Sequence, residues 1–264
     1  MFLKTDWTQH IHWIRRNEVE KVFSFLGSKK FKSGIEFGAG DGHQTIFLAP
    51  HFVTFISSDL NFGRIKENQK LSDVQYVKCD ADNLEGIFED KQFDLIFSSN
   101  MLEHLSNPKS FLKNVHMILK DGGYNVHVVP NRFVKITFTL FFYANVLTLI
   151  LDRIIGLFQG KKIFRGAEIY LENNINVISK NKEGRFRKIF IPSIHGNFKS
   201  HTEEFTKFGK KSWENLFMEC EFEVVKYIKG PAFSGYGFGF DKLRGIFEYL
   251  GWSSEHIFIL KKKN

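Results

Sequence analysis

Residues 34–42 read Gly-Ile-Glu-Phe-Gly-Ala-Gly-Asp-Gly, the most informative stretch of the chain. A short apolar run containing an acid leads into three glycines at alternate positions, and residues 44–48 continue with helical spacing. The pattern predicts a parallel strand, a tight turn and the start of a helix, with glycines that let a ligand approach the backbone and free N–H groups at the helix start. Its spacing differs from the G-x-G-x-x-G of dinucleotide-binding turns. Taken alone, the turn is equally consistent with a cofactor site and with a plain connection.

Predicted strands and helices alternate closely on either side of this turn. We expect a first helix over residues 8–26, strands at 34–37, 53–59, 74–80, 93–99 and 124–129, and helices near 44–50, 62–70, 84–88 and 108–119, the last stopped by Gly122-Gly123. Such alternation predicts an α/β fold with a doubly wound, mostly parallel sheet. Ligands bind such sheets at the carboxyl ends of the strands, where the glycine turn and several acids fall, so the cofactor interpretation is favoured.

The alternation stops after Pro130, which divides the chain into three parts. Residues 1–131 are expected to form a cofactor-binding core, and residues 132–211 a largely helical inserted lid. Residues 212–264 supply a helix and the last two strands, which complete a seven-stranded sheet. Within them, residues 231–252 form a loop rich in Gly and aromatics, and its first part, residues 230–240, either closes over an acceptor or is an irregular connection.

Composition excludes several classes of protein. The net charge of +8 favours an anionic partner, but the charge is scattered and no basic helix stands out, so nucleic acid is not expected. The two cysteines, Cys79 and Cys220, have neither disulfide-framework nor metal-ligand spacing. A metal site from His195, His201 and Glu203 would have no recognised ligand spacing, so none is expected. The first residues lack the apolar core of a signal peptide, which makes the cytoplasm the expected location.

Five landmarks, in order, resemble those of class I S-adenosylmethionine-dependent methyltransferases, in the group related to the ubiquinone and menaquinone methyltransferases. The landmarks are residues 36–42, Asp59 closing the second strand, Asp80-Ala81, residues 93–105 with the turn Leu-Glu-His-Leu, and residues 119–123, where Asp121 replaces the usual proline. The resemblance covers roughly residues 32–131 and the final helix and two strands. It implies a Rossmann-like methyltransferase fold with S-adenosylmethionine as cofactor.

The resemblance also implies which residues hold the cofactor. In it, the glycines make room for the methionine and ribose parts, Glu36 meets the amino group, Asp59 accepts the ribose hydroxyls, and Asp80 with Ala81 meets adenine. Turn acids and helix caps are the alternative interpretation of the three acids. The full set of cofactor-binding candidates is Glu36, Phe37, Gly38, Ala39, Gly40, Gly42, Asp59, Leu60, Asp80, Ala81, Ser98 and Asn100.

Three histidines are candidates for the acceptor side. His104 lies in the turn after the fourth strand, and His195 and His201 lie in a stretch similar to methyltransferases of bacterial surface-glycan synthesis. Each is a candidate general base, since a hydroxyl acceptor must lose its proton, or else a packed or lid residue without that role. The sequence therefore favours O-methylation of a saccharide or lipid-linked saccharide. The alternatives are methylation of a quinone or other isoprenoid-bearing molecule, a nicotinamide dehydrogenase, and a non-catalytic cofactor-binding scaffold.

Residues 133–158 are almost wholly apolar. A single membrane span here would separate strands of one sheet, and a two-span hairpin would need roughly forty apolar residues, which the stretch does not have. It is therefore either a buried or homodimer-forming lid helix, or an interfacial helix on anionic lipid at the inner face of the cell membrane. Basic residues near both ends favour the second: Arg132, Lys135, Arg153, Lys161 and Lys162.

Overall fold

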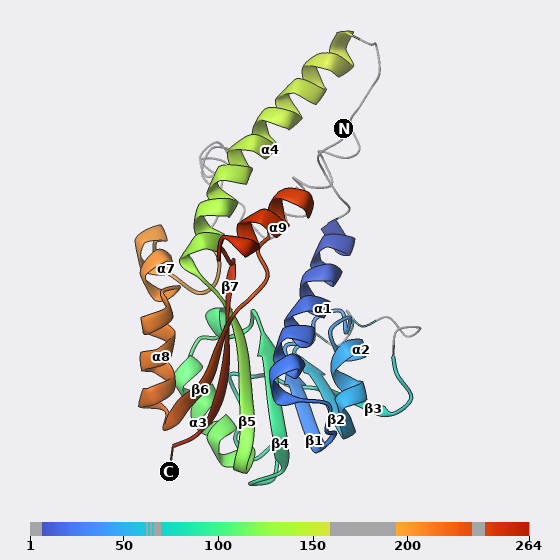
Figure 1. The fold of residues 1–264 in the computed structure, drawn as a ribbon, viewed down its shortest axis with the longest axis vertical. Helices are drawn as coiled ribbons and strands as arrows, with labels where there is room; N and C mark the ends of the chain where they lie inside the picture. Colours follow the sequence, from blue (N-terminus) through green and yellow to red (C-terminus); the bar gives the residue numbers. More distant parts are fainter. Residues whose placement is uncertain are drawn as a thin grey trace.

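The computed structural model describes residues 7–61, 63, 65, 70–158, 194–233 and 241–263. Seven strands form one sheet in the order β3-β2-β1-β4-β5-β7-β6 (Figure 1). β7 runs antiparallel to both of its neighbours, while the pairs on the other side of β5 are all parallel. The expected seven-stranded, mostly parallel α/β fold is therefore confirmed. The strands are β1 (Phe31–Phe37), β2 (Phe52–Asp59), β3 (Val74–Lys78), β4 (Phe93–Ser99), β5 (Leu119–Pro130), β6 (Phe222–Lys229) and β7 (Glu255–Lys262).

Helices cover both faces of the sheet, as a doubly wound fold requires. On one face lie α1 (Trp7–Leu26), the short α2 (Thr45–Leu48) and the 3₁₀ turn η1 (Ala49–His51), and on the other lie α3 (Pro108–Ile118) and α8 (Lys210–Glu219). Val22 of α1 and Leu48 of α2 belong to one apolar cluster, whereas Phe111 of α3 and Phe217 of α8 belong to a second. Burial of these apolar faces on the sheet stabilises both layers.

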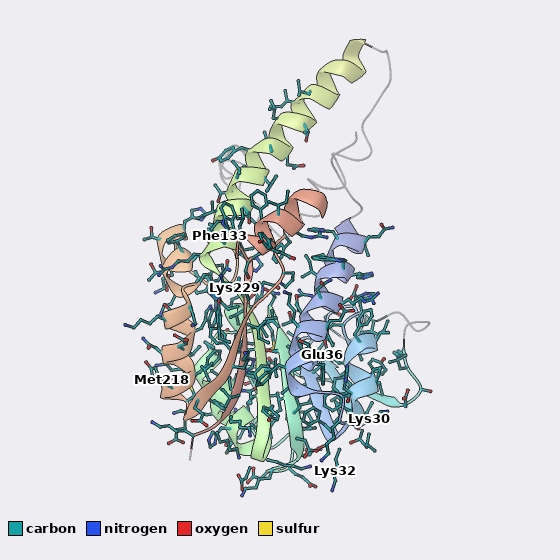
Figure 2. The ribbon with its side chains drawn as sticks, viewed as in Figure 1. Lys30, Lys32, Glu36, Phe133, Met218 and Lys229 are labelled. Atoms are coloured by element: carbon teal, nitrogen blue, oxygen red, sulfur yellow. The ribbon has the colours of Figure 1, made fainter. Side chains whose placement is uncertain are left out.

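The long helix α4 (Arg132–Phe158) leaves the end of β5 and extends away from the sheet (Figure 1). Phe133, at its base (Figure 2), packs against Trp252 with ring centroids 4.6 Å apart. α7 (His201–Lys207) and α9 (Asp241–Tyr249) also lie near this base (Figure 1). Among the helices that the structure describes, none combines the length and apolarity needed to cross a membrane.

Several local predictions were wrong. Residues 84–88 form turns instead of a helix, with Gly86 at φ +71°. The Gly122-Gly123 pair does not stop α3, because β5 starts directly at Leu119 and includes both glycines. There the pairing of β4 and β5 shifts register, and a Cβ on Gly123 would come within 3.0 Å of the Asp94 carbonyl oxygen. The pair therefore permits a bulge.

Two more predictions concern connecting segments. The stretch expected to be a loop over residues 231–252 contains α9, whose helical apolar spacing is obscured by the glycines around it. The helix predicted over residues 62–70 lies mostly outside the described residues. The division of the chain into core, inserted lid and closing segment stays a prediction.

Candidate active site

The glycine turn after β1 lies at the carboxyl ends of the central strands, where Phe37 pairs with Ser58 of β2 and Ser98 of β4. Gly38, Gly40 and Gly42 have φ of +76°, +61° and +78°, so all three need the freedom of glycine. The backbone N–H groups of Gly38 and its neighbour Ala39 donate to the Ser58 carbonyl oxygen, at 2.9 and 3.0 Å. These two amides therefore fasten the turn to β2.

The space around the turn is uneven. A Cβ on Gly38 would lie 3.0 Å from the Met101 side chain, and one on Gly42 would lie 3.2 Å from Ile65. A Cβ on Gly40 would meet no atom within 4 Å. Gly40 therefore marks the open position of the turn.

Asp59 ends β2 beside this open position. Its Oδ2 accepts the Gly40 N–H at 2.8 Å, and its Oδ1 accepts the Asn61 N–H at 2.7 Å. A carboxylate has about four acceptor sites, so each oxygen keeps capacity for a further donor such as a hydroxyl. The adjacent Leu60 is 60% exposed, so an apolar side chain borders the same opening.

Asp80 and Ala81 follow β3. Asp80 accepts hydrogen bonds within its own turn, from the Asp82 backbone N–H at 3.0 Å and from Asn83 Nδ2 at 2.7 Å. Asp82 in turn accepts the Ser106 N–H at 3.0 Å, which joins this turn to the segment after β4. Ala81 is half-buried and packs against the core. Asp80 thus has the turn role that was the alternative interpretation, and its contact with adenine stays a prediction.

Three candidates are buried. Glu36 lies inside the molecule beneath the turn (Figure 2), accepts the Thr45 hydroxyl at 2.5 Å, and has its pKa raised to about 7 by burial. The Phe37 ring lies in the core against Phe111, so its backbone is the part left to border the turn. The Ser98 hydroxyl is buried and bonded to His127 Nδ1 at 2.7 Å, which points it away from any open surface.

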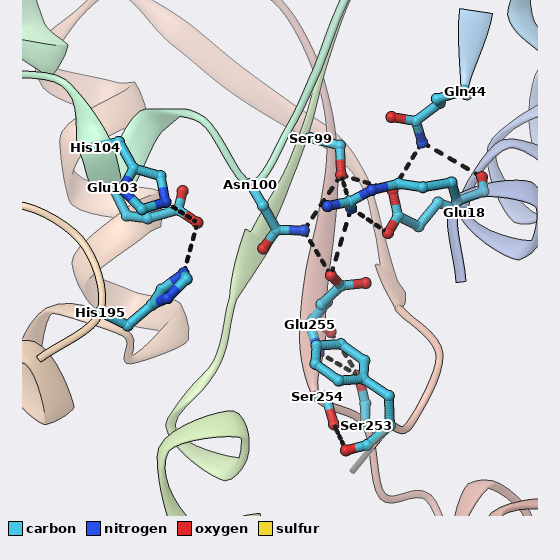
Figure 3. Close-up of polar contacts among 12 residues, drawn as sticks. Glu18, Gln44, Ser99, Asn100, Glu103, His104, His195, Ser253, Ser254 and Glu255 are labelled. Atoms are coloured by element: carbon cyan, nitrogen blue, oxygen red, sulfur yellow. Dashed lines mark hydrogen bonds and ion pairs between the residues drawn. The ribbon is translucent and has the colours of Figure 1, made fainter. Parts of the chain in front are cut away.

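Asn100 joins a polar network that sequence reasoning missed (Figure 3). Its Nδ2 donates to Glu255 of β7 at 2.7 Å. Glu18 of α1 accepts Arg15 Nη1 at 2.7 Å, and its second oxygen accepts the Ser99 hydroxyl at 2.6 Å. Burial, and then the nearby Glu18 carboxylate, raise the pKa of Glu255 well above its ordinary value. The network draws on α1, β4 and β7, which no local pattern brings together.

His104 and His195 do come together, and they meet at Glu103. All three lie near the 3₁₀ turn η4 (Leu102–His104), with the Nε2 atoms of His195 and His104 at 3.5 and 3.9 Å from Glu103 Oε1 (Figure 3). The loop carrying His195 is fixed by the Asn197 N–H, which donates to the Glu103 carbonyl oxygen at 2.7 Å. We refer to Glu103, His104 and His195 as the Glu103 cluster. Glu103 was not among the residues predicted from the sequence, although it adjoins His104 in the turn after β4.

His201 belongs to a different group. Its Nδ1 lies 3.6 Å from Oε2 of the buried Glu204, and the same carboxylate oxygen lies 2.6 Å from Lys135 Nζ. The ion-pair contact described for His201 therefore involves Glu204 and not Glu103. A catalytic role for His201 stays a prediction that these contacts do not favour.

Comparisons with known proteins identify the class. The profile of a family described as a methyltransferase domain matches residues 11–227, most of the chain. Over 60 residues the chain is 33% identical to the mitochondrial ubiquinone biosynthesis O-methyltransferase of Dictyostelium discoideum, a match that covers 23% of this chain and 19% of that protein.

Solved structures agree in fold. A protein assigned as an S-adenosylmethionine-dependent methyltransferase from Listeria monocytogenes superposes with a TM-score of 0.55 at 12% identity, covering 95% of this chain and 98% of its own. An S-adenosylmethionine-dependent methyltransferase from Mesorhizobium loti gives 0.54 at 12% identity, covering 92% and 96%.

The chain belongs to the class I S-adenosylmethionine-dependent methyltransferases. The expected enzyme class and cofactor are thereby confirmed, and the family implies a small-molecule acceptor. The described residues fit the cofactor, because Gly40 leaves open space beside an Asp59 carboxylate with spare acceptor capacity. When bound, S-adenosylmethionine supplies an electrophilic methyl group, and the protein's part is to hold it and the acceptor in line.

Proposed function

We propose that the protein O-methylates a hydroxyl group of a saccharide or lipid-linked saccharide in bacterial surface-glycan synthesis. The observation that carries the proposal is the Glu103 cluster, which gathers a buried carboxylate and two imidazoles at the end of the sheet where the glycine turn lies. A hydroxyl acceptor must lose its proton during methyl transfer, whereas a neutral amine attacks without prior deprotonation. A group of this kind therefore suits an oxygen acceptor.

The Glu103 cluster adjoins the cofactor side of the site. The Met101 side chain packs on Gly38, and the His104 N–H donates to the Met101 carbonyl oxygen at 2.9 Å. The half-buried Phe138 ring lies 6.3 Å from the His195 ring, and the fully buried Phe208 ring supports His195 from the core at the same distance. Apolar and aromatic walls with a few convergent polar groups are typical of small-molecule sites, and they suit the faces of a sugar ring. We assign the acceptor to this space, with Gly40 and Asp59 on the cofactor side.

A lipid-linked acceptor is supported by α4. Its exposed large apolar residues follow one helical stripe: Ile136, Leu140, Tyr143, Leu147 and Ile150. Phe138, on the same helix, contacts the His195 ring, so α4 carries both the stripe and a contact with the Glu103 cluster. We propose that α4 lies on the membrane surface beside the lipid carrier, so that the enzyme works in the cytoplasm on the inner face of the cell membrane.

The basic residues near the base of α4 contribute less to this than the sequence suggested. Lys135 pairs with the buried Glu204, and Arg132 Nε donates to the Phe205 carbonyl oxygen at 3.0 Å. The side chain of Arg153 and the residues Lys161 and Lys162 lie outside the described part. The apolar stripe therefore carries the membrane proposal, and homodimer formation through the same stripe is its competitor.

A quinone or another isoprenoid-bearing ring is the second candidate acceptor. It is favoured by the short match to the ubiquinone biosynthesis O-methyltransferase, together with the apolar α4. Both candidates present a hydroxyl on a lipid-bearing molecule. They differ in the ring that carries it.

The test is a methyl-transfer assay with radiolabelled S-adenosylmethionine on polyprenyl-phosphate-linked sugars, free sugars and demethylated quinols, in detergent and in vesicles. We expect label in lipid-linked sugars, and less label with an Asp59→Ala variant at a limiting concentration of S-adenosylmethionine. If label appears only in quinols, the acceptor is a quinol and not a saccharide. Tight S-adenosylhomocysteine binding with no labelled product from any of these acceptors would favour a cofactor-binding scaffold.

A further inference from the structure

The Glu103 cluster has the composition of a metal site, although the sequence predicted none. The Oε1 atom of Glu103 and the imidazole nitrogens of His104 and His195 all lie within 4.8 Å of one another. Around a tetrahedral zinc ion with bonds of about 2.1 Å, ligand atoms are about 3.4 Å apart. The carboxylate lies 3.5 Å and 3.9 Å from the two imidazole nitrogens, close to that value, and because all three ligand atoms lie within 4.8 Å of one another, rotation of the partly exposed imidazoles completes the geometry. We infer that Glu103, His104 and His195 bind a divalent cation of the zinc type.

The state of Glu103 supports this assignment independently of the ligand spacing. Its side chain is fully buried, and among the described residues neither carboxylate oxygen has a hydrogen-bond partner. A buried carboxylate without hydrogen bonds is costly, and a metal ion is one of the few groups that stabilise it. Two imidazoles and one carboxylate are also the donor set that zinc and its neighbours in the first transition row prefer.

The backbone holds these ligands in place from two separate segments. Glu103 and His104 are consecutive in η4, while His195 arrives from the segment before α7. Gly196, at φ +85°, lies so close to η4 that a Cβ would be 2.7 Å from the Glu103 carbonyl oxygen. A glycine is therefore required directly after His195 for this segment to reach the carboxylate.

Three protein ligands leave at least one coordination position for another molecule. The side chains of His104 and His195 are 50% and 37% exposed, so that position opens to the outside. This part of the inference rests on the proposed function: the acceptor hydroxyl occupies the open coordination position. The ion lowers the pKa of this hydroxyl, whose proton leaves to water. The resulting oxygen forms a bond to the methyl carbon as the carbon–sulfur bond breaks, which releases S-adenosylhomocysteine.

The test uses the full chain, freed of metal by chelator dialysis and titrated with Co²⁺ and Zn²⁺. Cobalt absorption reports the ligand geometry, calorimetry gives the affinity for Zn²⁺, and circular dichroism checks the fold. S-adenosylhomocysteine binding is measured in parallel. The variants are Glu103→Gln and His195→Ala, with His116→Ala on α3 as the control that removes an imidazole elsewhere. His195 lies in an irregular segment, so its variant remains informative if Glu103→Gln fails to fold.

We expect one Co²⁺ per chain with tetrahedral-type absorption, displaced by Zn²⁺, and an affinity at least 100-fold weaker in His195→Ala but unchanged in His116→Ala. The inference is overturned if the wild type binds Co²⁺ no more tightly than His195→Ala while S-adenosylhomocysteine binding is intact. Because binding is read without an acceptor, failure of the proposed methylation would appear separately, as a loaded metal site with no methylated product.

Discussion

The Asp59 carboxylate accepts the backbone N–H of Gly40 at 2.8 Å, which ties the end of β2 to the open position of the glycine turn. One side chain thus shapes the turn and offers acceptor sites at the same opening. The two roles are physically linked, because a ligand hydroxyl bound by this carboxylate would sit beside the only one of the three turn glycines whose added Cβ would meet open space.

Replacing Asp59 by Ala should weaken S-adenosylhomocysteine binding by about ten- to a hundredfold, since a hydrogen bond to a charged group is worth about 1.5–3 kcal/mol. Titration calorimetry measures the affinity. Asp73→Ala, which removes an exposed carboxylate from the loop before β3, should bind like the wild type. Unchanged affinity in Asp59→Ala would remove this residue from the cofactor site.

Glu18 should be a strong stability determinant. Its two buried oxygens accept hydrogen bonds from Arg15, Ser99 and Gln44, so Glu18→Ala removes the carboxylate nearest to the Arg15 guanidinium and the shorter of the two hydrogen bonds of the Gln44 amide. Loss of one partner of a buried ion pair costs about 3–5 kcal/mol. Urea unfolding should show a loss of that size.

The matched control lies on the same helix. Glu20 pairs with Arg16 at 2.7 Å, with both side chains more than half exposed. Exposed pairs one helical turn apart contribute about 0.3–0.5 kcal/mol, so Glu20→Ala should scarcely change stability. Equal losses of unfolding free energy in Glu18→Ala and Glu20→Ala would contradict the conclusion that the buried polar network holds α1 on the sheet.

The raised pKa of Glu36 predicts a pH-dependent stability. Between pH 4.5 and 7 the unfolded chain releases the proton of this carboxyl while the folded protein keeps it, so folding stability falls as pH rises through this window. The shift corresponds to about 3 kcal/mol. Glu36→Gln keeps an acceptor for the Thr45 hydroxyl but cannot ionise. Relative to the wild type, it should gain stability from pH 4.5 to 7.5, as measured by chemical unfolding across that range, and a parallel pH dependence in both proteins would contradict the buried acid.

His127 should make folding stability depend on pH in the opposite direction, with a loss as the pH falls. Burial lowers its pKa to about 3, so below pH 6.5 the unfolded chain takes up a proton that the folded protein does not. Stability contributed by this residue is therefore lost as pH falls, by about 2–3 kcal/mol between pH 6.5 and 4.5. The double variant Ser98→Ala/His127→Leu removes both partners of the buried hydrogen bond and should flatten this loss. Ser98→Ala alone, which keeps the imidazole, should retain the loss.

Membrane binding by the apolar stripe on α4 can be tested by introducing charged side chains into it. Leu140→Glu and Leu147→Glu, combined, place two carboxylates on this exposed face and should abolish flotation with anionic liposomes while S-adenosylhomocysteine binding is unchanged. Sedimentation of the wild type in parallel measures its mass. A dimer that the double variant converts to a monomer, with no flotation of either protein, would assign the stripe to a second copy of the chain.

The amino-acid sequence was sufficient to predict the seven strands in order and the class of the enzyme. Alternating strands and helices, the glycine turn and the acid at the end of β2 are local signals, since each depends on residues close together in the chain. The spacing of apolar residues and the residues in the turns therefore sufficed to predict the parallel sheet. The order of the landmarks identified the methyltransferase class.

Only the tertiary structure decided which of the candidate residues meet. His195 reaches Glu103 across more than ninety positions of the chain, and Glu255 reaches Asn100 from the first residue of β7. Burial likewise separated Glu36 and Ser98, which are enclosed, from Asp59, which borders the opening. Such contacts depend on how distant segments pack and on what solvent they exclude, and no spacing in the sequence encodes either.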